Sequence, residues 1–138
     1  MRVLVRNIEG LNFEGKADSN HWVSMDGPSD LGGFEAASKP MELILIALGG
    51  CTGMDVVSLM EKMRVEYEDL DIEISASREE EHPKVFSEIE ILYKVWGDVD
   101  EEKVKRAIDK SQNKYCSVSA MLRNTAEVSY SYEINPDR

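Results

Sequence analysis

The chain has 138 residues, which suggests a single domain, and 42% of them are hydrophobic. This hydrophobic content is enough for a packed core and argues against a disordered chain. The formal net charge is −11, from 16 basic and 27 acidic residues. Such a charge argues against nucleic acid or an anionic membrane surface as a partner. The N-terminal residues lack the apolar segment of a signal peptide, so we expect a cytoplasmic protein.

The N-terminal part of the chain, residues 1–26, is predicted to form a three-stranded meander. The three strands are expected at residues 2–8, around Leu11 and Phe13, and at residues 21–25. A loop follows at residues 27–39, because this stretch contains glycine and proline pairs that interrupt regular structure. Loops of this length are often functional.

The longest uncharged apolar run predicts a central helix over about residues 40–63. Its first half has no polar face, so we expect a helix that is buried on all sides. Pro40 suits the first helical turn, and Ser38 is the expected N-cap. The apolar run is too short for a membrane span and is closely followed by Asp55, so we expect no membrane partner.

The position of Glu42 on this helix has a geometric consequence. Glu42 and Cys51 are nine positions apart, which is about 180° around a helix axis. On one straight helix the two side chains therefore point in opposite directions. Either the helix breaks near Gly49 and Gly50, or the two residues serve different pockets, as they would in a symmetric dimer. An all-apolar helix in so small a chain also favours a dimer.

The C-terminal part, residues 65–135, is predicted to contain two strands, two helices and a final strand. The expected elements are a strand at 70–77, a strand at 85–96, a helix capped by Asp100, a short helix capped by Ser117, and a strand at 125–134. Cys116 precedes the short helix, where unpaired N–H groups favour a thiolate. The whole order predicts an α+β fold with a mainly antiparallel sheet and helices on one side.

The two cysteines, Cys51 and Cys116, are the candidate reactive residues. Without a secretory signal they do not form a disulfide framework, which leaves structural thiols, a metal pair or a redox pair. The chain has only two histidines, and no two cysteine or histidine residues are closely spaced. We therefore expect no metal site, and we expect no cofactor.

Two motifs together resemble the OsmC/Ohr superfamily of osmotically induced and organic-hydroperoxide-resistance proteins. They read P-M-E-L-I-L-I-A-L-G-G-C-T-G-M-D-V-V, from Pro40, and K-Y-C-S-V-S, around Cys116. The resemblance extends over nearly the whole chain and implies one OsmC-like domain over residues 1–138. It also implies an intertwined homodimer with mainly antiparallel sheets around a long buried central helix.

The resemblance assigns roles to three residues. Cys51 matches the peroxidatic cysteine of the family, Cys116 matches the resolving cysteine, and Glu42 matches a glutamate that pairs with an arginine beside the reactive thiol. It therefore implies a thiol-dependent peroxidase that reduces organic hydroperoxides through a Cys51–Cys116 disulfide. A dithiol would be its reductant, and its role would be in the response to oxidative or osmotic stress.

The chain departs from the peroxidase pattern in its arginines, because none occurs between Arg6 and Arg64. Lys39 is the basic residue nearest to Glu42 in the sequence, and a lysine does not reproduce a bidentate arginine–carboxylate pair. This departure favours an alternative function, a binding or redox-sensing module for a small hydrophobic or sulfur-containing ligand. In a third alternative, both cysteines are inert core residues.

Overall fold

The computed structural model describes residues 1–138 and has an α+β fold with two three-stranded sheets and three α-helices. The chain forms two compact units, Met1–Ile46 and Ala47–Arg138. The family resemblance implied one OsmC-like domain over residues 1–138, and this single-domain assignment stays a prediction.

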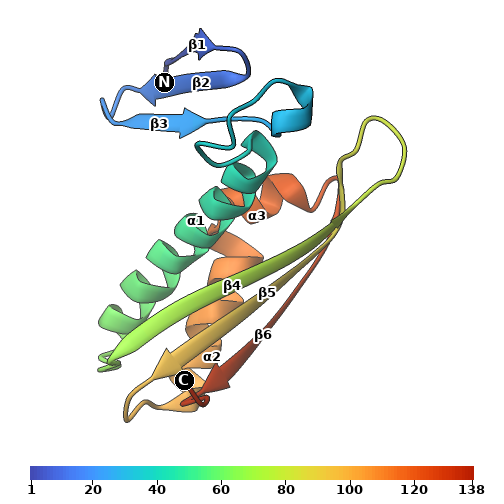
Figure 1. Ribbon diagram of the computed structural model, residues 1–138. Helices are drawn as coiled ribbons and strands as arrows, with labels where there is room; N and C mark the ends of the chain where they lie inside the picture. Colours follow the sequence, from blue (N-terminus) through green and yellow to red (C-terminus); the bar gives the residue numbers. More distant parts are fainter. The chain divides into compact units, whose positions relative to one another are not determined.

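The first unit contains the predicted antiparallel meander (Figure 1). Its strands are β1 (Val3–Glu9), β2 (Asn12–Ala17) and β3 (Trp22–Met25). The following loop is organised around Asp26, which is 1% exposed and accepts hydrogen bonds from the backbone N–H groups of Gly27, Phe34 and Ala36. Within this loop, Gly33 lies so close to Gly27 that a Cβ atom added to Gly33 would be 2.0 Å from the Gly27 carbonyl oxygen.

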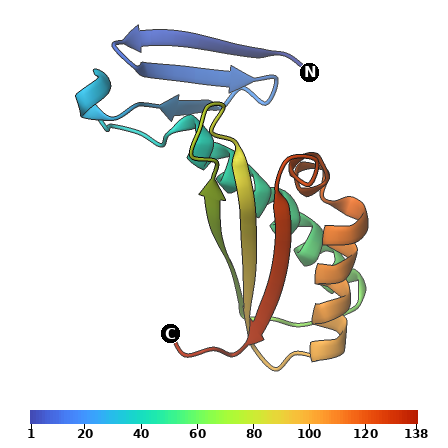
Figure 2. The same cartoon turned by 90° about the vertical axis from the view of Figure 1, so that its right-hand side faces the viewer.

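The second unit contains a mixed sheet with the order β4-β5-β6. Its strands are β4 (Asp69–Arg78), β5 (Phe86–Trp96) and β6 (Glu127–Ile134). The pairing of β4 with β5 is antiparallel, whereas β5 and β6 are parallel. A parallel pair needs a long crossover, and α2 (Glu101–Lys110), a π-helical turn (Ser111–Tyr115) and α3 (Ser117–Leu122) provide it. Figure 2 shows that the helices of this unit lie on one face of the sheet.

The core of the second unit lies between the central strand β5 and the helices. From Ile89 to Val95 alternate residues of β5 are buried, which explains the period of two in this part of its sequence. These residues are Ile89, Ile91, Tyr93 and Val95. Opposite them, α2 buries Val104, Ala107 and Ile108. Gly49 and Gly53 of α1 face β4, where an added Cβ atom would lie 3.4 Å from Ile74 and 3.1 Å from Ile72.

The helix α1 (Pro40–Lys62) is continuous, so the predicted alternative of a break near Gly49 and Gly50 is wrong. The expectation of burial on all sides is also wrong for the single chain. One stripe is buried, at Leu48, Thr52, Val56 and Met60. Ile46 is 60% exposed and Met54 is 76% exposed. By length and composition α1 would be able to cross a membrane, a test that core helices of soluble proteins also pass.

Of the three N-caps expected from the sequence, the structure has one. Asp100 caps α2 as predicted, with Asp100 Oδ1 accepting a hydrogen bond from the Lys103 N–H at 3.2 Å. The Ser38 prediction is wrong by one residue, because α1 begins at Pro40 and the Lys39 carbonyl accepts the first helical hydrogen bond, from the Leu43 N–H at 3.1 Å. The Ser117 prediction is wrong by one residue, because Cys116 is the N-cap of α3.

The packing of α1 on the sheet leads to a stability prediction. Leu48 is fully buried, so Leu48→Ala should lower the free energy of unfolding by about 2–5 kcal/mol through lost burial and a residual cavity. Urea unfolding followed by circular dichroism measures this change. The control is Ser58→Ala, an exposed substitution on the same helix that should change stability by less than about 0.5 kcal/mol. Equal effects of the two substitutions would contradict the packing.

Candidate functional site

The second unit brings its two thiols together. Cys51 lies on α1 and Cys116 caps α3, 65 positions later in the chain. Both thiols are free, and their Sγ atoms lie within 4.8 Å of each other and of a carboxylate oxygen of Asp55. The structure therefore places both predicted cysteines, with one carboxylate, in a single cluster.

The two thiols differ in their surroundings. Cys51 is half-buried, whereas Cys116 is 3% exposed. Burial raises the pKa of the Cys116 thiol to about 11, and Cys51 and the Asp55 carboxylate also raise it. The Ser119 N–H donates a hydrogen bond to Cys116 Sγ at 3.4 Å, which lowers the pKa but does not offset the burial. The expectation that the helix N-terminus favours a Cys116 thiolate is therefore wrong.

Asp55 is the site residue that the sequence reasoning missed. It follows Cys51 by four positions on α1, so both side chains lie on one face of the helix. The Ser111 hydroxyl donates a hydrogen bond to Asp55 Oδ2 at 3.1 Å, which orients the carboxylate. The Cys-x-x-x-Asp spacing in a helix was the available signal.

A buried network of polar side chains lies directly beside the thiols. Thr52 Oγ1 is 2.5 Å from the Tyr93 hydroxyl and 2.8 Å from the Ser111 hydroxyl. Gln112 Nε2 donates to both Thr52 Oγ1 and the Tyr93 hydroxyl, at 3.0 and 2.7 Å. Burial raises the pKa of Tyr93 to about 12, so its hydroxyl stays protonated at neutral pH. The network joins α1, β5 and the π-helical turn, an element that is frequent at functional sites.

An arginine reaches this network but does not bond to a thiol. The Arg123 guanidinium donates to Gln112 Oε1 at 3.1 Å, to Ser119 Oγ at 3.3 Å and to the Val128 carbonyl at 3.3 Å. All three of its nitrogens are therefore occupied by neutral acceptors. Arg123 orients the side chains around the site, and its hydrogen bonds leave the thiols without an arginine partner.

The third predicted site residue, Glu42, belongs to the first unit. Its side chain is exposed, and its Oε2 accepts a hydrogen bond from the Lys39 N–H at 2.8 Å. This is half of a capping box, in which an acidic residue of the first turn bonds back to the N-cap residue. Glu42 forms no ion pair within the chain, which agrees with the lack of a matching arginine in the sequence.

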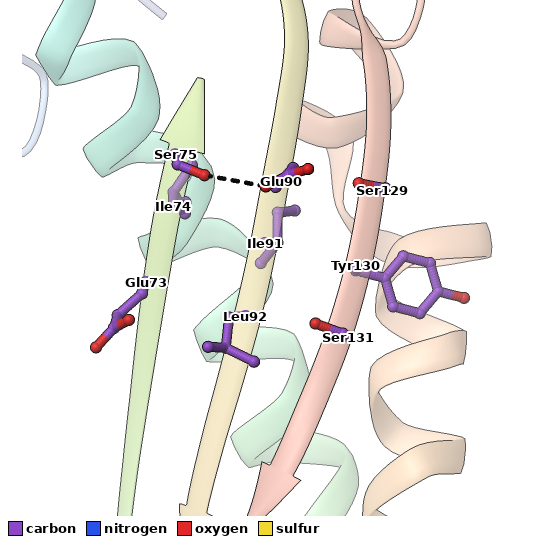
Figure 3. Close-up of a pocket in the computed structure, with 9 residues that line it drawn as sticks. All are labelled: Glu73, Ile74, Ser75, Glu90, Ile91, Leu92, Ser129, Tyr130 and Ser131. Carbon is purple, nitrogen blue, oxygen red and sulfur yellow. Dashed lines mark hydrogen bonds between the residues drawn. The ribbon is translucent and has the colours of Figure 1, made fainter. Parts of the chain in front are cut away.

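The sheet of the second unit also has a hollow, drawn in Figure 3. It is lined by β4, β5 and β6, and the Ser75 hydroxyl donates to Glu90 across it at 3.4 Å. No cysteine lines this hollow. The hollow is therefore separate from the thiol cluster.

The chain is similar to one protein family and to several known proteins along most of its length. The OsmC-like protein family matches residues 32–131. Protein YhfA of Escherichia coli strain K12 is 39% identical over 135 residues, which cover 97% of this chain and 98% of YhfA. A hypothetical protein from Aquifex aeolicus VF5 is 31% identical, with a TM-score of 0.81 over 98% of this chain and 97% of that chain.

A peroxide-resistance protein shares the fold at a greater distance. The organic hydroperoxide resistance protein of Elizabethkingia anophelis is 18% identical, with a TM-score of 0.74 over 96% of this chain and 94% of that chain. The family match and the relatives both cover most of the chain. The resemblance read from the two cysteine motifs is confirmed, and the chain belongs to the OsmC-like protein family.

Proposed function

We propose that the protein is a thiol-dependent peroxidase that reduces organic hydroperoxides with Cys51 and Cys116. The observation that carries this proposal is the approach of the two free Sγ atoms to within 4.8 Å. Family membership and the fold of hydroperoxide-resistance proteins support a redox or stress role more broadly. A role in the oxidative or osmotic stress response is part of the proposal.

The different surroundings of the two thiols support the roles proposed for them. Cys51 is the more accessible thiol, so it is the one that meets the substrate. Cys116 has a pKa of about 11 and is almost entirely protonated at neutral pH, which makes it a poor first nucleophile. Its burial beside Cys51 suits the resolving thiol, which needs to react with its neighbour alone.

The reaction proceeds in two steps before reduction. The Cys51 thiolate attacks the hydroperoxide, the O–O bond breaks, and with one proton the products are a Cys51 sulfenic acid and an alcohol. The Cys116 thiol then displaces the hydroxyl from this sulfenic acid, which yields the disulfide and one water molecule. A dithiol reductant next reduces the disulfide through thiol–disulfide exchange and is itself oxidised to a disulfide.

The exposed face of α1 supports an intertwined homodimer. Ile46 and Met54 are large apolar side chains that the single chain leaves 60% and 76% exposed. Because α1 has no break, Glu42 and Cys51 serve different pockets, and in a dimer Glu42 would belong to the site of the partner chain. We also place the protein in the cytoplasm, where thiols are kept reduced.

One observation favours a second function, a redox-sensing or ligand-binding module. Asp55, an acidic residue rather than an arginine, lies beside the two sulfurs, whereas peroxide attack requires a thiolate. In this alternative the pair is oxidised slowly, or the site holds a small hydrophobic or sulfur-containing ligand. The peroxide experiment below separates the two functions.

The pKa of Cys116 leads to a prediction about its alkylation. The rate of Cys116 modification by iodoacetamide should rise with pH through the neutral range and reach half of its plateau near pH 11, because only the thiolate reacts. Asp55→Asn should move this profile to lower pH, because it removes an anion that disfavours the thiolate. Peptide mass spectrometry gives the rate for each cysteine. Asp71→Asn, an exposed substitution on β4, is the control and should leave the profile unchanged.

The peroxidase proposal predicts the fate of both thiols. One equivalent of cumene hydroperoxide should remove both thiols of the reduced protein, read by thiol titration and intact mass. Cys116→Ser should stop the reaction at a Cys51 sulfenic acid that dimedone traps. Cys51→Ser is the matched control, and its Cys116 should survive the peroxide. Survival of both thiols in the unmodified protein would reject the peroxidase and favour the alternative module.

The dimer proposal predicts the effect of a charge on the exposed face of α1. Met54→Glu should lower the measured mass from that of a dimer to that of a monomer in light scattering coupled to gel filtration. The reason is the cost of burying an unpaired carboxylate in an apolar interface. Glu102→Gln, an exposed change on α2, away from this face of α1, should leave the dimer intact. A monomeric unmodified protein would contradict the proposal.

A further inference from the structure

Three donor atoms converge at the thiol cluster, and the geometry points to a metal site: we propose that Cys51, Cys116 and Asp55 of the reduced protein bind a zinc-like divalent cation. The two sulfur atoms and a carboxylate oxygen all lie within 4.8 Å of one another. Neither the family relationship nor the proposed peroxidase reaction calls for a metal. The inference therefore goes beyond the proposed function and rests on the donor atoms themselves.

The donor set fits the preferences of zinc. Zinc binds thiolate sulfur at about 2.3 Å and carboxylate oxygen at about 2.0–2.2 Å, in a tetrahedral arrangement. Donors at these distances are about 3.5–3.8 Å apart, so side-chain movements of about 1 Å or less would close the cluster around a cation. Three protein ligands leave a fourth position for water, on the half-buried side formed by Cys51 and Asp55.

The side chains around the cluster hold two of the donors in place. The Ser111 hydroxyl donates to Asp55 Oδ2 at 3.1 Å, and the Ser119 N–H donates to Cys116 Sγ at 3.4 Å. Ser111 is itself held by Thr52 at 2.8 Å. Hydrogen bonds of this kind orient metal ligands and contribute to affinity in known sites.

The charge of the cluster also favours a cation. Metal binding would displace the thiol protons, and the two thiolates and one carboxylate would then carry three negative charges, while no lysine, arginine or histidine is paired with Asp55. A divalent cation would supply the missing positive charge. Because the metal competes with protons for the sulfurs, its affinity should increase with pH. The metal and a Cys51–Cys116 disulfide exclude each other, since both use the same two sulfur atoms.

The test is a titration of the freshly reduced, metal-free full chain with Co²⁺, followed by displacement with Zn²⁺. One Co²⁺ per chain should bind, with sulfur-to-cobalt charge-transfer absorption and the intense visible bands of a tetrahedral site. Cys116→Ser should greatly weaken the charge-transfer absorption. Asp55→Asn should weaken binding by about tenfold or more while the charge-transfer absorption persists at saturation. Asp71→Asn is the control and should bind Co²⁺ like the unmodified protein.

Two results would overturn the inference. One is the absence of charge-transfer absorption when thiol titration shows that both cysteines are reduced. The other is binding that neither Cys116→Ser nor Asp55→Asn changes. Should Asp55→Asn fail to fold by circular dichroism, Asp55→Ser replaces it. The titration contains no peroxide, so it gives the same answer whether or not the peroxidase reaction occurs.

Discussion

The second unit depends on one buried hydroxyl, that of Thr52. It lies next to Cys51 on α1 and bonds to Tyr93 on β5 and to Ser111 and Gln112 on the π-helical turn. A buried polar group without a partner costs about 1–3 kcal/mol, and no buried polar side-chain atom of the structure lacks one. The network therefore specifies one alignment of helix, strand and turn, and with it the separation of the two thiols.

The thiol cluster combines neighbours that disfavour thiolate formation at Cys116. Burial, a second thiol and a carboxylate all raise the pKa of Cys116. The Arg123 guanidinium is bonded to Gln112, Ser119 and a backbone carbonyl, and not to a thiol. A proton, a disulfide or a cation would each relieve the resulting accumulation of negative charge. These three states define the chemistry available to the site.

The order of helices and strands was predictable from the sequence. The extent to which a single chain buries each helix and strand was not. Alternation in the strands and the apolar run of α1 are local patterns, so they were recognised. The parallel pairing of β5 with β6 was not, because alternation looks the same in both kinds of pair. The apolar run of α1 has no polar face, so it was expected to be buried on all sides. The single chain buries only one stripe of it, because hydrophobicity does not tell whether the same chain or another one covers a residue.

The site was predictable in part. Cys51 and Cys116 were identified from their motifs, whereas Asp55 was overlooked because Ser111, which bonds to it, and the second sulfur, of Cys116, come from distant parts of the chain. The N-cap of α3 was assigned to Ser117 instead of Cys116, since hydroxyls are the more usual caps. The pKa of Cys116 was predicted in the wrong direction, because its burial depends on tertiary packing that no local pattern reveals.

The long separation of the two thiols along the chain has a thermodynamic consequence. A bond between Cys51 and Cys116 would close a loop of 65 positions and restrict the unfolded chain, which corresponds to about 4 kcal/mol of stabilisation by the loop-entropy relation. By linkage, folding favours this bond by the same amount. The native fold would thus make the pair more easily oxidised than it is in the unfolded chain, and oxidation would in turn protect the fold against unfolding.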